Sequence, residues 1–241
     1  ESSQPLPAPS AATPAAATRA DNLRLFFAIV PALEVTRKLA QAIETMRKRA
    51  RDVGIQVAWV PPANLHLTLK FLGWTRAAAA DALADKVKVH VLGHKGFELT
   101  VKGVQAFPSG QAPARILWAG IEPCDPLTRL FADLEPSFQE LGALAEARPF
   151  HPHITLGRVR TGKNARDLIL PFANVTFGGF WAREVVLYES RVKFKGSEYT
   201  PLCRVPFDVP PEVHRQTDEL KEGSTNEHTH GGQSDSGGEP T

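Results

Sequence analysis

Two short segments with alternating apolar and polar side chains constrain the fold of this chain more than any other feature. They read His-Leu-Thr-Leu at residues 66–69 and His-Ile-Thr-Leu at residues 153–156. Alternation with period two is typical of a β-strand that has one face in a hydrophobic core and the other in polar surroundings. From one histidine to the other the chain advances 87 residues, which is too long for a solenoid repeat and fits two halves of a duplicated fold.

The alternation predicts which side chains share a face of each strand. Along residues 65–71 it places His66, Thr68 and Lys70 on one face, and the leucines with Phe71 on the other. The second motif likewise groups its histidine and threonine opposite two aliphatic side chains. Each strand therefore presents an imidazole and a hydroxyl about 7 Å apart.

Two such strands that face each other across a groove supply what displacement at a phosphodiester needs. With a pKa near 6.5, His66 and His153 can supply one neutral imidazole, which takes a proton from water, and one imidazolium, which protonates the departing oxygen. The hydroxyls of Thr68 and Thr155 can donate to phosphate oxygens without adding charge. This chemistry requires no metal ion.

A metal site is the alternative interpretation of the same residues. His151 and His153 form a His-x-His pair, and His66 could be a third ligand. A zinc site does not call for threonine at the matching position of each motif, and no carboxylate or cysteine stands beside either motif. A lone His-x-Thr segment is usually a polar pair on a solvent-exposed face, so the functional interpretation depends on the presence of two copies.

The remaining pattern predicts an α+β fold with helices packed against antiparallel sheets. Apolar residues at helical spacing predict helices over 32–51, 76–92, 125–142 and 163–169. Short apolar or alternating runs predict strands at 23–30, 56–60, 64–72 (closed by Gly73), 97–107, 114–121, 149–159, 174–181, 183–192 and 198–207.

Both ends of the chain have compositions that cannot form a core. Residues 1–21 are rich in Ala, Pro, Ser and Thr, and residues 209–241 are rich in Gly, Ser and charged residues, so we expect two disordered tails around a single domain at 22–208. From Asp208 onward there are eight acidic and two basic residues, which leaves 26 basic and 18 acidic residues before it. A basic domain suits a polyanionic ligand, although solvated surface charge accounts for the same numbers.

Cysteine usage and hydropathy give expectations about the compartment. Cys124 and Cys203 form no disulfide framework and no metal-binding spacing. No apolar run reaches the length of a membrane span, and the start lacks a basic region followed by a hydrophobic stretch. We expect a cytoplasmic protein that does not contact a membrane.

The two motifs and their flanks resemble the paired signatures of the 2H phosphoesterase superfamily. Within it, the chain is similar to the bacterial and archaeal RNA 2′,3′-cyclic phosphodiesterases, also called 2′-5′ RNA ligases. Further agreement comes from residues 24–28 (Arg-Leu-Phe-Phe-Ala), 66–73, 117–120 (Leu-Trp-Ala-Gly) and 187–190 (Leu-Tyr-Glu-Ser), with Gly196 and Tyr199. The resemblance covers about residues 22–208.

This resemblance implies a fold of two pseudo-symmetric lobes, each an antiparallel sheet with helices outside, and an active-site groove between them. It implies hydrolysis of RNA 2′,3′-cyclic phosphate ends to 2′-phosphates without metal or cofactor. Ligation to a 2′-5′ linkage, the reverse direction at the same site, is an alternative over which dilution by water favours hydrolysis. By position, His66 and His153 are catalytic, with His66 as the acid toward the 3′ oxygen, and Thr68 and Thr155 bind phosphate. The partner is then an RNA 3′ end, bound by a monomer with no obligate protein partner.

Several residues around the motifs have open roles. In the manner of the family Arg158 approaches the phosphate, but strict alternation places it on the Ile154 face unless the strand twists or bulges after Gly157. Phe27, Trp118 and Tyr199 could stack on a nucleobase or pack in the core. The alternatives for the whole chain are a 2H phosphodiesterase acting on another cyclic or 2′-5′-linked nucleotide, and a module that binds RNA ends without turnover.

Overall fold

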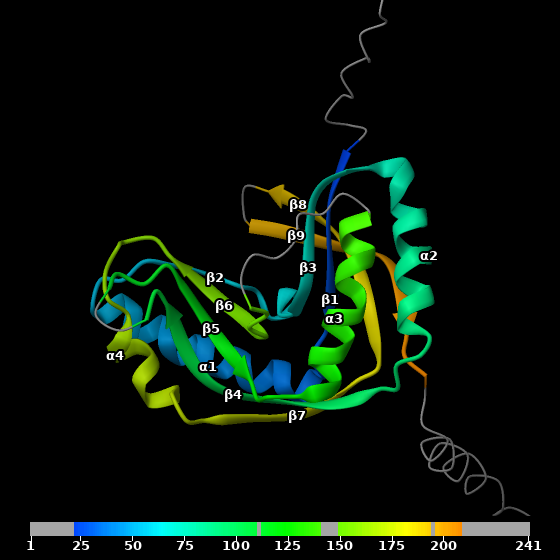
Figure 1. Cartoon of the computed structure of the whole chain (residues 1–241). Helices are drawn as coiled ribbons and strands as arrows, with labels where there is room; N and C mark the ends of the chain where they lie inside the picture. The colour runs from blue at the N-terminus through cyan, green and yellow to red at the C-terminus, as the bar shows by residue number, and fades with distance from the viewer. Residues whose placement is uncertain (1–21, 110–111, 141–148, 194–195, 209–241) are drawn as a thin grey trace, which may run out of the picture. The chain divides into compact units, whose positions relative to one another are not determined.

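The computed structural model describes residues 22–109, 112–140, 149–193 and 196–208 (Figure 1). Its helices are α1 (Leu33–Asp52), α2 (Ala80–Val91), α3 (Asp125–Glu140) and α4 (Arg166–Ile169). Its strands are β1 (Asn22–Ile29), β2 (Val57–Trp59), β3 (Leu67–Arg76), β4 (Phe97–Phe107), β5 (Ile116–Ile121), β6 (His153–Val159), β7 (Thr176–Ala182), β8 (Glu184–Lys193) and β9 (Gly196–Pro206). The α+β class with antiparallel strands, expected from the sequence, is confirmed.

The described strands form one hydrogen-bonded sheet in the order β7-β4-β5-β6-β3-β1-β8-β9, with β2 added beside β6. Every strand pair in this path is antiparallel. The path divides into two groups of four strands, β9-β8-β1-β3 and β6-β5-β4-β7. A single residue pair, Leu67 with Ile154, joins the two groups through β3 and β6. The bonding therefore links the two expected sheets into one, and the two-lobed arrangement stays a prediction.

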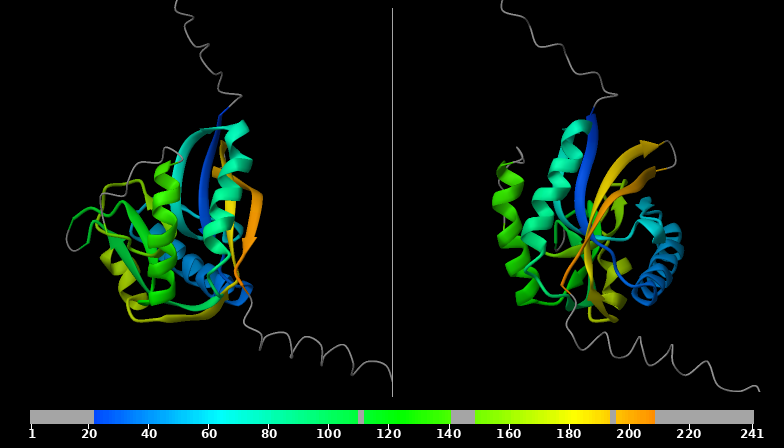
Figure 2. Two further views of the ribbon diagram at one scale, coloured as in Figure 1. Left: turned by 45° about the vertical axis from the view of Figure 1, so that its right-hand side comes forward. Right: turned by 90° about the vertical axis from the view of Figure 1, so that its right-hand side faces the viewer.

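The helices cover the sheet in two pairs. Figure 1 shows α2 beside α3 next to β1 and β3, whereas α1 and α4 lie together near β4 and β7. The amphipathic pattern of α1 explains its orientation, because Leu39, Ile43 and Met46 at helical spacing are all buried. The two views in Figure 2 show the same pairing of helices from the side.

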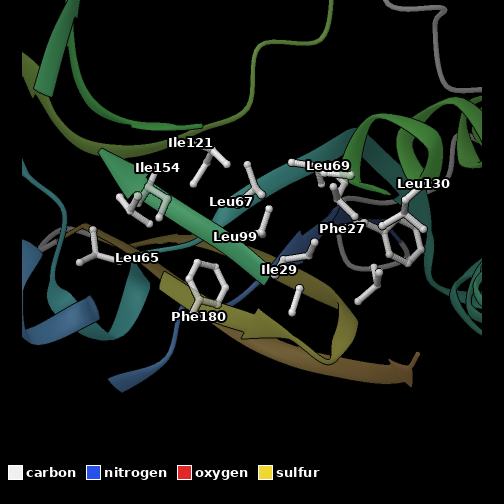
Figure 3. Close-up of a cluster of buried hydrophobic side chains, with 14 of the residues drawn as sticks. Phe27, Ile29, Leu65, Leu67, Leu69, Leu99, Ile121, Leu130, Ile154 and Phe180 are labelled. Atoms are coloured by element: carbon white, nitrogen blue, oxygen red, sulfur yellow. The ribbon is translucent and has the colours of Figure 1, made fainter. Parts of the chain in front are cut away.

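One main hydrophobic core extends across both groups of strands. Side chains from β1, β3, β4 and β6 meet side chains of α1, α2 and α3 in this cluster. Figure 3 shows Leu67 and Ile154 close together within it, with Leu69 and Phe27 to their right and Phe180 below them. Both partners of the joining pair are completely buried, so burial of apolar surface holds the two strands together at this point.

The observed element bounds differ most from the sequence expectation at β3. The strand was expected to end at Gly73, but it continues to Arg76. A β-bulge between residues 71 and 73 makes this possible: Gly73 adopts a φ of 70°, which glycine tolerates, and pairing with β1 resumes at once. The expected helix at 163–169 is shorter, covering only α4.

Two further expectations concern the tails of the chain and membrane-spanning segments. The tails expected at 1–21 and 209–241 lie outside the described residues. Within the described ranges, no helix combines the length and apolar character needed to cross a membrane.

Candidate active site

The pairing of β3 with β6 brings the two histidine motifs together. Leu67 and Ile154 are partners in an antiparallel ladder, so the flanking positions set His66 next to Thr155, and Thr68 next to His153. Because Leu67 and Ile154 both point into the core, the four polar side chains lie on the opposite face of the sheet. All four are partly exposed there. The arrangement has an approximate twofold symmetry, with one imidazole and one hydroxyl from each strand.

A hydrogen bond to a backbone carbonyl fixes the first imidazole. The Nδ1 atom of His66 lies 2.7 Å from the carbonyl oxygen of Asn64. Since a carbonyl can only accept, Nδ1 carries the hydrogen and Nε2 is the atom left for proton exchange. The side-chain amide of Asn64 donates to the carbonyl of Ser197 at 2.7 Å, which ties this turn to the β8–β9 hairpin.

The second imidazole is held in the same way. The Nδ1 atom of His153 lies 2.8 Å from the carbonyl oxygen of His151, two residues earlier, just as Asn64 precedes His66. Trp118 packs beside it, with ring centroids 5.5 Å from His153 and 5.0 Å from His151. Among the described residues neither ring has a hydrogen bond at Nε2, so both catalytic candidates present that nitrogen.

The environment of His66 favours its neutral form. Burial lowers the pKa of His66, the hydrogen bond to Asn64 acts in the opposite direction, and the charge of His153 lowers the pKa further. The electrostatic effect of His153 shows that the two imidazoles are near enough for the proton on one to oppose a proton on the other.

Lys70 does not lie beside the two motifs, which corrects the expectation from strict alternation. The ladder with β1 pairs Ala28 with Thr68 and Phe27 with Lys70, so Leu69 is an extra residue in a β-bulge. The bulge turns Lys70 to the helix-covered face, where it is 5% exposed and its Nζ lies 2.9 Å from a carboxylate oxygen of Glu135 on α3. The same bulge moves Phe71 from the expected apolar face to the face of His66.

A second bulge brings Arg158 to the face of the two histidines. The ladder with β5 pairs Trp118 with Thr155 and Leu117 with Gly157, which leaves Leu156 as the extra residue. Arg158 therefore shares the face of Thr155, although strict alternation predicted the opposite face. The bulge precedes Gly157 rather than following it. Arg158 is exposed, so its guanidinium can reach a phosphate bound beside Thr155.

The aromatic candidates divide between core and site. Phe27 is fully buried against Phe138 on α3, so it is a core residue. Tyr199 contacts the ring of His66 edge-on, with centroids 5.3 Å apart. Trp118 is 9% exposed and borders His153, as described above.

Sequence reasoning missed two residues of the site. Phe26, the neighbour of Phe27, is fully buried beneath the imidazole of His66 with centroids 4.9 Å apart, and it also contacts Tyr188 at 5.3 Å. Alternation along β1 carried this signal, because only one of two adjacent phenylalanines can face the core. The positioning role of Asn64 had no sequence signal, since it depends on the β8–β9 hairpin.

The residues proposed for the metal alternative form no metal cluster. In the part of the chain that the structure describes, no group of three or more His, Cys, Asp or Glu side chains is arranged to hold a metal ion. His151 contributes its backbone carbonyl and its ring contact with Trp118.

The fold and the paired motifs define a class of phosphoesterase with two histidines on adjacent strands. A family model described as the 2′-5′ RNA ligase superfamily matches residues 35–193, and the chain belongs to this superfamily. The RNA 2′,3′-cyclic phosphodiesterase of Methanothermobacter thermautotrophicus is 29% identical over 71% of this chain and 94% of its own length.

Solved structures agree with this assignment. The crystal structure of TT0787 of Thermus thermophilus superimposes with a TM-score of 0.66 at 28% identity, covering 77% of this chain and 98% of that one. The crystal structure of Escherichia coli LigT complexed with 3′-AMP matches with a TM-score of 0.60 at 28% identity and the same coverage.

Proposed function

We propose that this protein hydrolyses 2′,3′-cyclic phosphates at RNA ends to 2′-phosphates, with His66 and His153 as its acid–base pair. The observation that carries the proposal is the matched presentation of two imidazoles, each with Nδ1 bound to a carbonyl and Nε2 left for proton exchange. Displacement at phosphorus needs one proton removed and one proton supplied, and two such nitrogens can do both.

The reaction breaks one bond and forms one bond at phosphorus. The oxygen of a water molecule attacks the phosphorus as the basic imidazole takes its proton. The bond from phosphorus to the 3′ oxygen breaks, and the acidic imidazolium gives that oxygen a proton. The products are a 2′-phosphate and a free 3′ hydroxyl. At the end of the step the basic imidazole carries a proton and the acidic imidazole has lost one.

We assign His66 as the acid and His153 as the base, following the resemblance to the family. Burial lowers the pKa of His66, which works against a proton on the empty site. A phosphodiester carries a negative charge, however, and that charge beside Nε2 favours the protonated imidazole. The bound phosphodiester therefore favours the protonated form of His66 that an acid needs.

Thr68, Thr155 and Arg158 bind the phosphate in this mechanism. The two hydroxyls lie on the face of the imidazoles and can donate to the non-bridging oxygens. The guanidinium of Arg158 offsets the negative charge that develops as the 3′ oxygen departs. Support for the substrate comes from the relatives, which are named RNA 2′,3′-cyclic phosphodiesterases, and from LigT structures solved with 3′-AMP and with phosphate.

The first test is to incubate the protein and EDTA with a short RNA that ends in a 2′,3′-cyclic phosphate, and to identify the product. We expect a 2′-phosphate. His66→Ala and His153→Ala should each lower the rate roughly 10²- to 10⁴-fold, and the double variant should lose little more because the pair acts as a unit. His90→Ala on α2 is the control and should keep the rate. A double variant with most of the rate intact would refute the two-histidine mechanism.

A substrate with sulfur in place of the 3′ oxygen separates the roles of the two histidines. A thiolate leaves without prior protonation because thiols are far more acidic than alcohols. The His66→Ala variant should therefore recover most of its lost rate on this substrate, while His153→Ala should not. If His153→Ala recovers its rate and His66→Ala does not, then His153 is the acid and His66 is the base. That result would leave the proposal of a two-histidine acid–base pair intact.

A further inference from the structure

The face of β3 that carries His66 and Thr68 continues as an aromatic stripe away from the phosphate site. Two bulges reset the alternation, so this face presents residues 66, 68, 71 and 74 in order. Phe71 pairs across the ladder with Phe26, and Trp74 pairs with Arg24. Strict period-two alternation along the strand does not predict this stripe, because it assigns positions 71 and 74 to opposite faces.

The outer two aromatic side chains of this stripe are not core residues. Phe71 is 45% exposed and Trp74 is 63% exposed, although both are large and apolar. Phe71 stacks on Phe26 with centroids 5.2 Å apart, and the guanidinium carbon of Arg24 lies 5.5 Å from the Phe71 ring centroid. A rigid aromatic face with an arginine plane beside it is the surface on which unpaired nucleobases stack.

The charge of this face suits a polyanion. By the strand pairing Arg24 and Arg76 lie on it, and the described positions of β1 and β3 include no carboxylate. On the neighbouring hairpin, alternation turns Glu189 and Glu198 to the other face, where they form ion pairs with Arg191 and Lys193. Phosphate groups along the stripe therefore meet Arg24 and Arg76. The carboxylates of the hairpin lie at its margins and are paired: Glu184, on the face of Tyr188, with Arg204, and Glu189, in the wall of a hollow beside β1, with Arg191.

The stripe ends in a hollow where β8 diverges from β1. The two strands pair only from Leu25 to Ala28 on β1, although β1 begins at Asn22. Figure 2 shows β8 and β9 leaning away from β1 beyond this paired stretch. Arg24, Trp74 and Val192 line the resulting depression of about 810 Å³, together with the paired side chains of Glu189 and Arg191. Trp74 forms one wall of it and remains largely exposed.

We propose that Phe71, Trp74 and Arg24 form a binding site for the nucleotides on the 5′ side of the cyclic phosphate in single-stranded RNA. This inference rests on the proposed function, which places the phosphate between Thr68 and Thr155. From Thr68 to Trp74 the strand extends roughly 20 Å, which is more than the terminal nucleoside occupies. The protein is thereby selective for oligonucleotides over cyclic mononucleotides.

The test compares kcat/KM for substrates of increasing length, from a 2′,3′-cyclic mononucleotide to a tetranucleotide with the same terminal nucleoside. We expect the wild-type value to rise with length. Trp74→Ala should lower the value for the tetranucleotide by roughly 5- to 100-fold, the effect of losing one base-stacking contact, and leave the mononucleotide unchanged. Trp181→Ala removes a tryptophan that is 40% exposed on β7, which is at one end of the strand order and four strands from β3, and should change kcat/KM for neither substrate.

Equal wild-type values for all lengths, or an equal loss on both substrates in Trp74→Ala, would overturn the inference and leave the proposed reaction intact. Binding of oligonucleotides that end in a 2′-phosphate, followed by fluorescence anisotropy, tests the same site without turnover. We expect Trp74→Ala to weaken binding of the tetranucleotide and not of the mononucleotide. If no substrate is turned over, the proposed function fails, and this binding measurement still decides the inference.

Discussion

The two imidazoles of the site share one mode of attachment, a hydrogen bond from Nδ1 to the carbonyl two residues earlier. Their surroundings differ. His66 lies over the buried ring of Phe26 and beside Tyr199, whereas His153 borders Trp118. Equivalent positions in the two halves therefore hold chemically distinct histidines, as an acid and a base acting in one reaction require.

The pKa of His66 can be measured directly by NMR titration of its ring protons. We expect it below 6.5 in the free protein, because burial and the charge of His153 both oppose protonation. In His153→Asn the second effect is lost, so the pKa of His66 should rise toward its ordinary value. A pKa of His66 that does not respond to this change would contradict the electrostatic coupling of the pair.

The same shift makes stability depend on pH. The folded protein binds a proton on His66 less readily than the unfolded chain does, so the unfolded state holds more protons below pH 6.5. The free energy of unfolding should therefore be fully retained above about pH 6.5 and should fall as pH drops through the lowered pKa. Urea denaturation at pH 7.5 and pH 5 should show a smaller loss for His66→Asn than for the wild type. An equal loss in both proteins would contradict this account.

At the scale of elements, a buried ion pair connects β3 with α3. Lys70 is 5% exposed and Glu135 is 17% exposed at the side chain, and Nζ lies 2.9 Å from the carboxylate. The Leu69 bulge is what turns this lysine toward the helix. The ion pair can form only if the bulge forms, so its contribution to stability tests the bulge.

Replacement of Lys70 by Met should destabilise the fold by about 2–4 kcal/mol, because a largely buried carboxylate loses its lysine partner. Lys86→Met breaks the pair between Lys86 and Glu140, whose side chains are 46% and 66% exposed, and should change stability by less than about 1 kcal/mol. Chemical denaturation of both variants measures the difference. Equal effects would show that Lys70 is not buried against α3.

The second bulge of β3 depends on glycine. Gly73 has a φ of 70°, and a Cβ atom added there would meet no atom within 4 Å, so the only cost of a side chain is backbone strain. Gly73→Ala should therefore destabilise the fold by about 1–2 kcal/mol. Gly93→Ala, at another uncrowded glycine without a positive φ, should be neutral or slightly stabilising. If both substitutions have the same effect in thermal denaturation, the bulge conformation is wrong.

At the scale of the whole molecule, one core unites the two groups of strands. Leu67 and Ile154 come from different groups, and α1, α2 and α3 all contribute to the same cluster. The two histidine motifs lie on the strands that this core joins. Unfolding of either group of strands would therefore expose the apolar side chains of this core, which hold the two motifs together.

We expect the protein to unfold in one cooperative transition. Shared burial couples the two groups of strands, so neither can unfold without exposing apolar surface of the other. Differential scanning calorimetry should give equal calorimetric and van't Hoff enthalpies. Two separated transitions would show instead that the groups behave as independent folding units.

The sequence alone determined the local features of this protein. The period-two alternation around His66 and His153 identified two strands and their polar faces, and helical spacing located α1, α2 and α3 within a few residues. These features could be predicted because each depends on neighbours in the chain and on which side chains avoid water. The same alternation predicted that the two threonines of the site share the faces of the histidines.

Only the tertiary structure decided how these pieces meet. It joined β3 and β6 through Leu67 and Ile154, and it placed bulges that turn Lys70 inward and bring Arg158 to the face of the histidines. A bulge inverts every later position on its strand, so residues beyond it could not be assigned by counting. Bulges and strand partners depend on packing between segments far apart in the chain, and local periodicity does not carry that information.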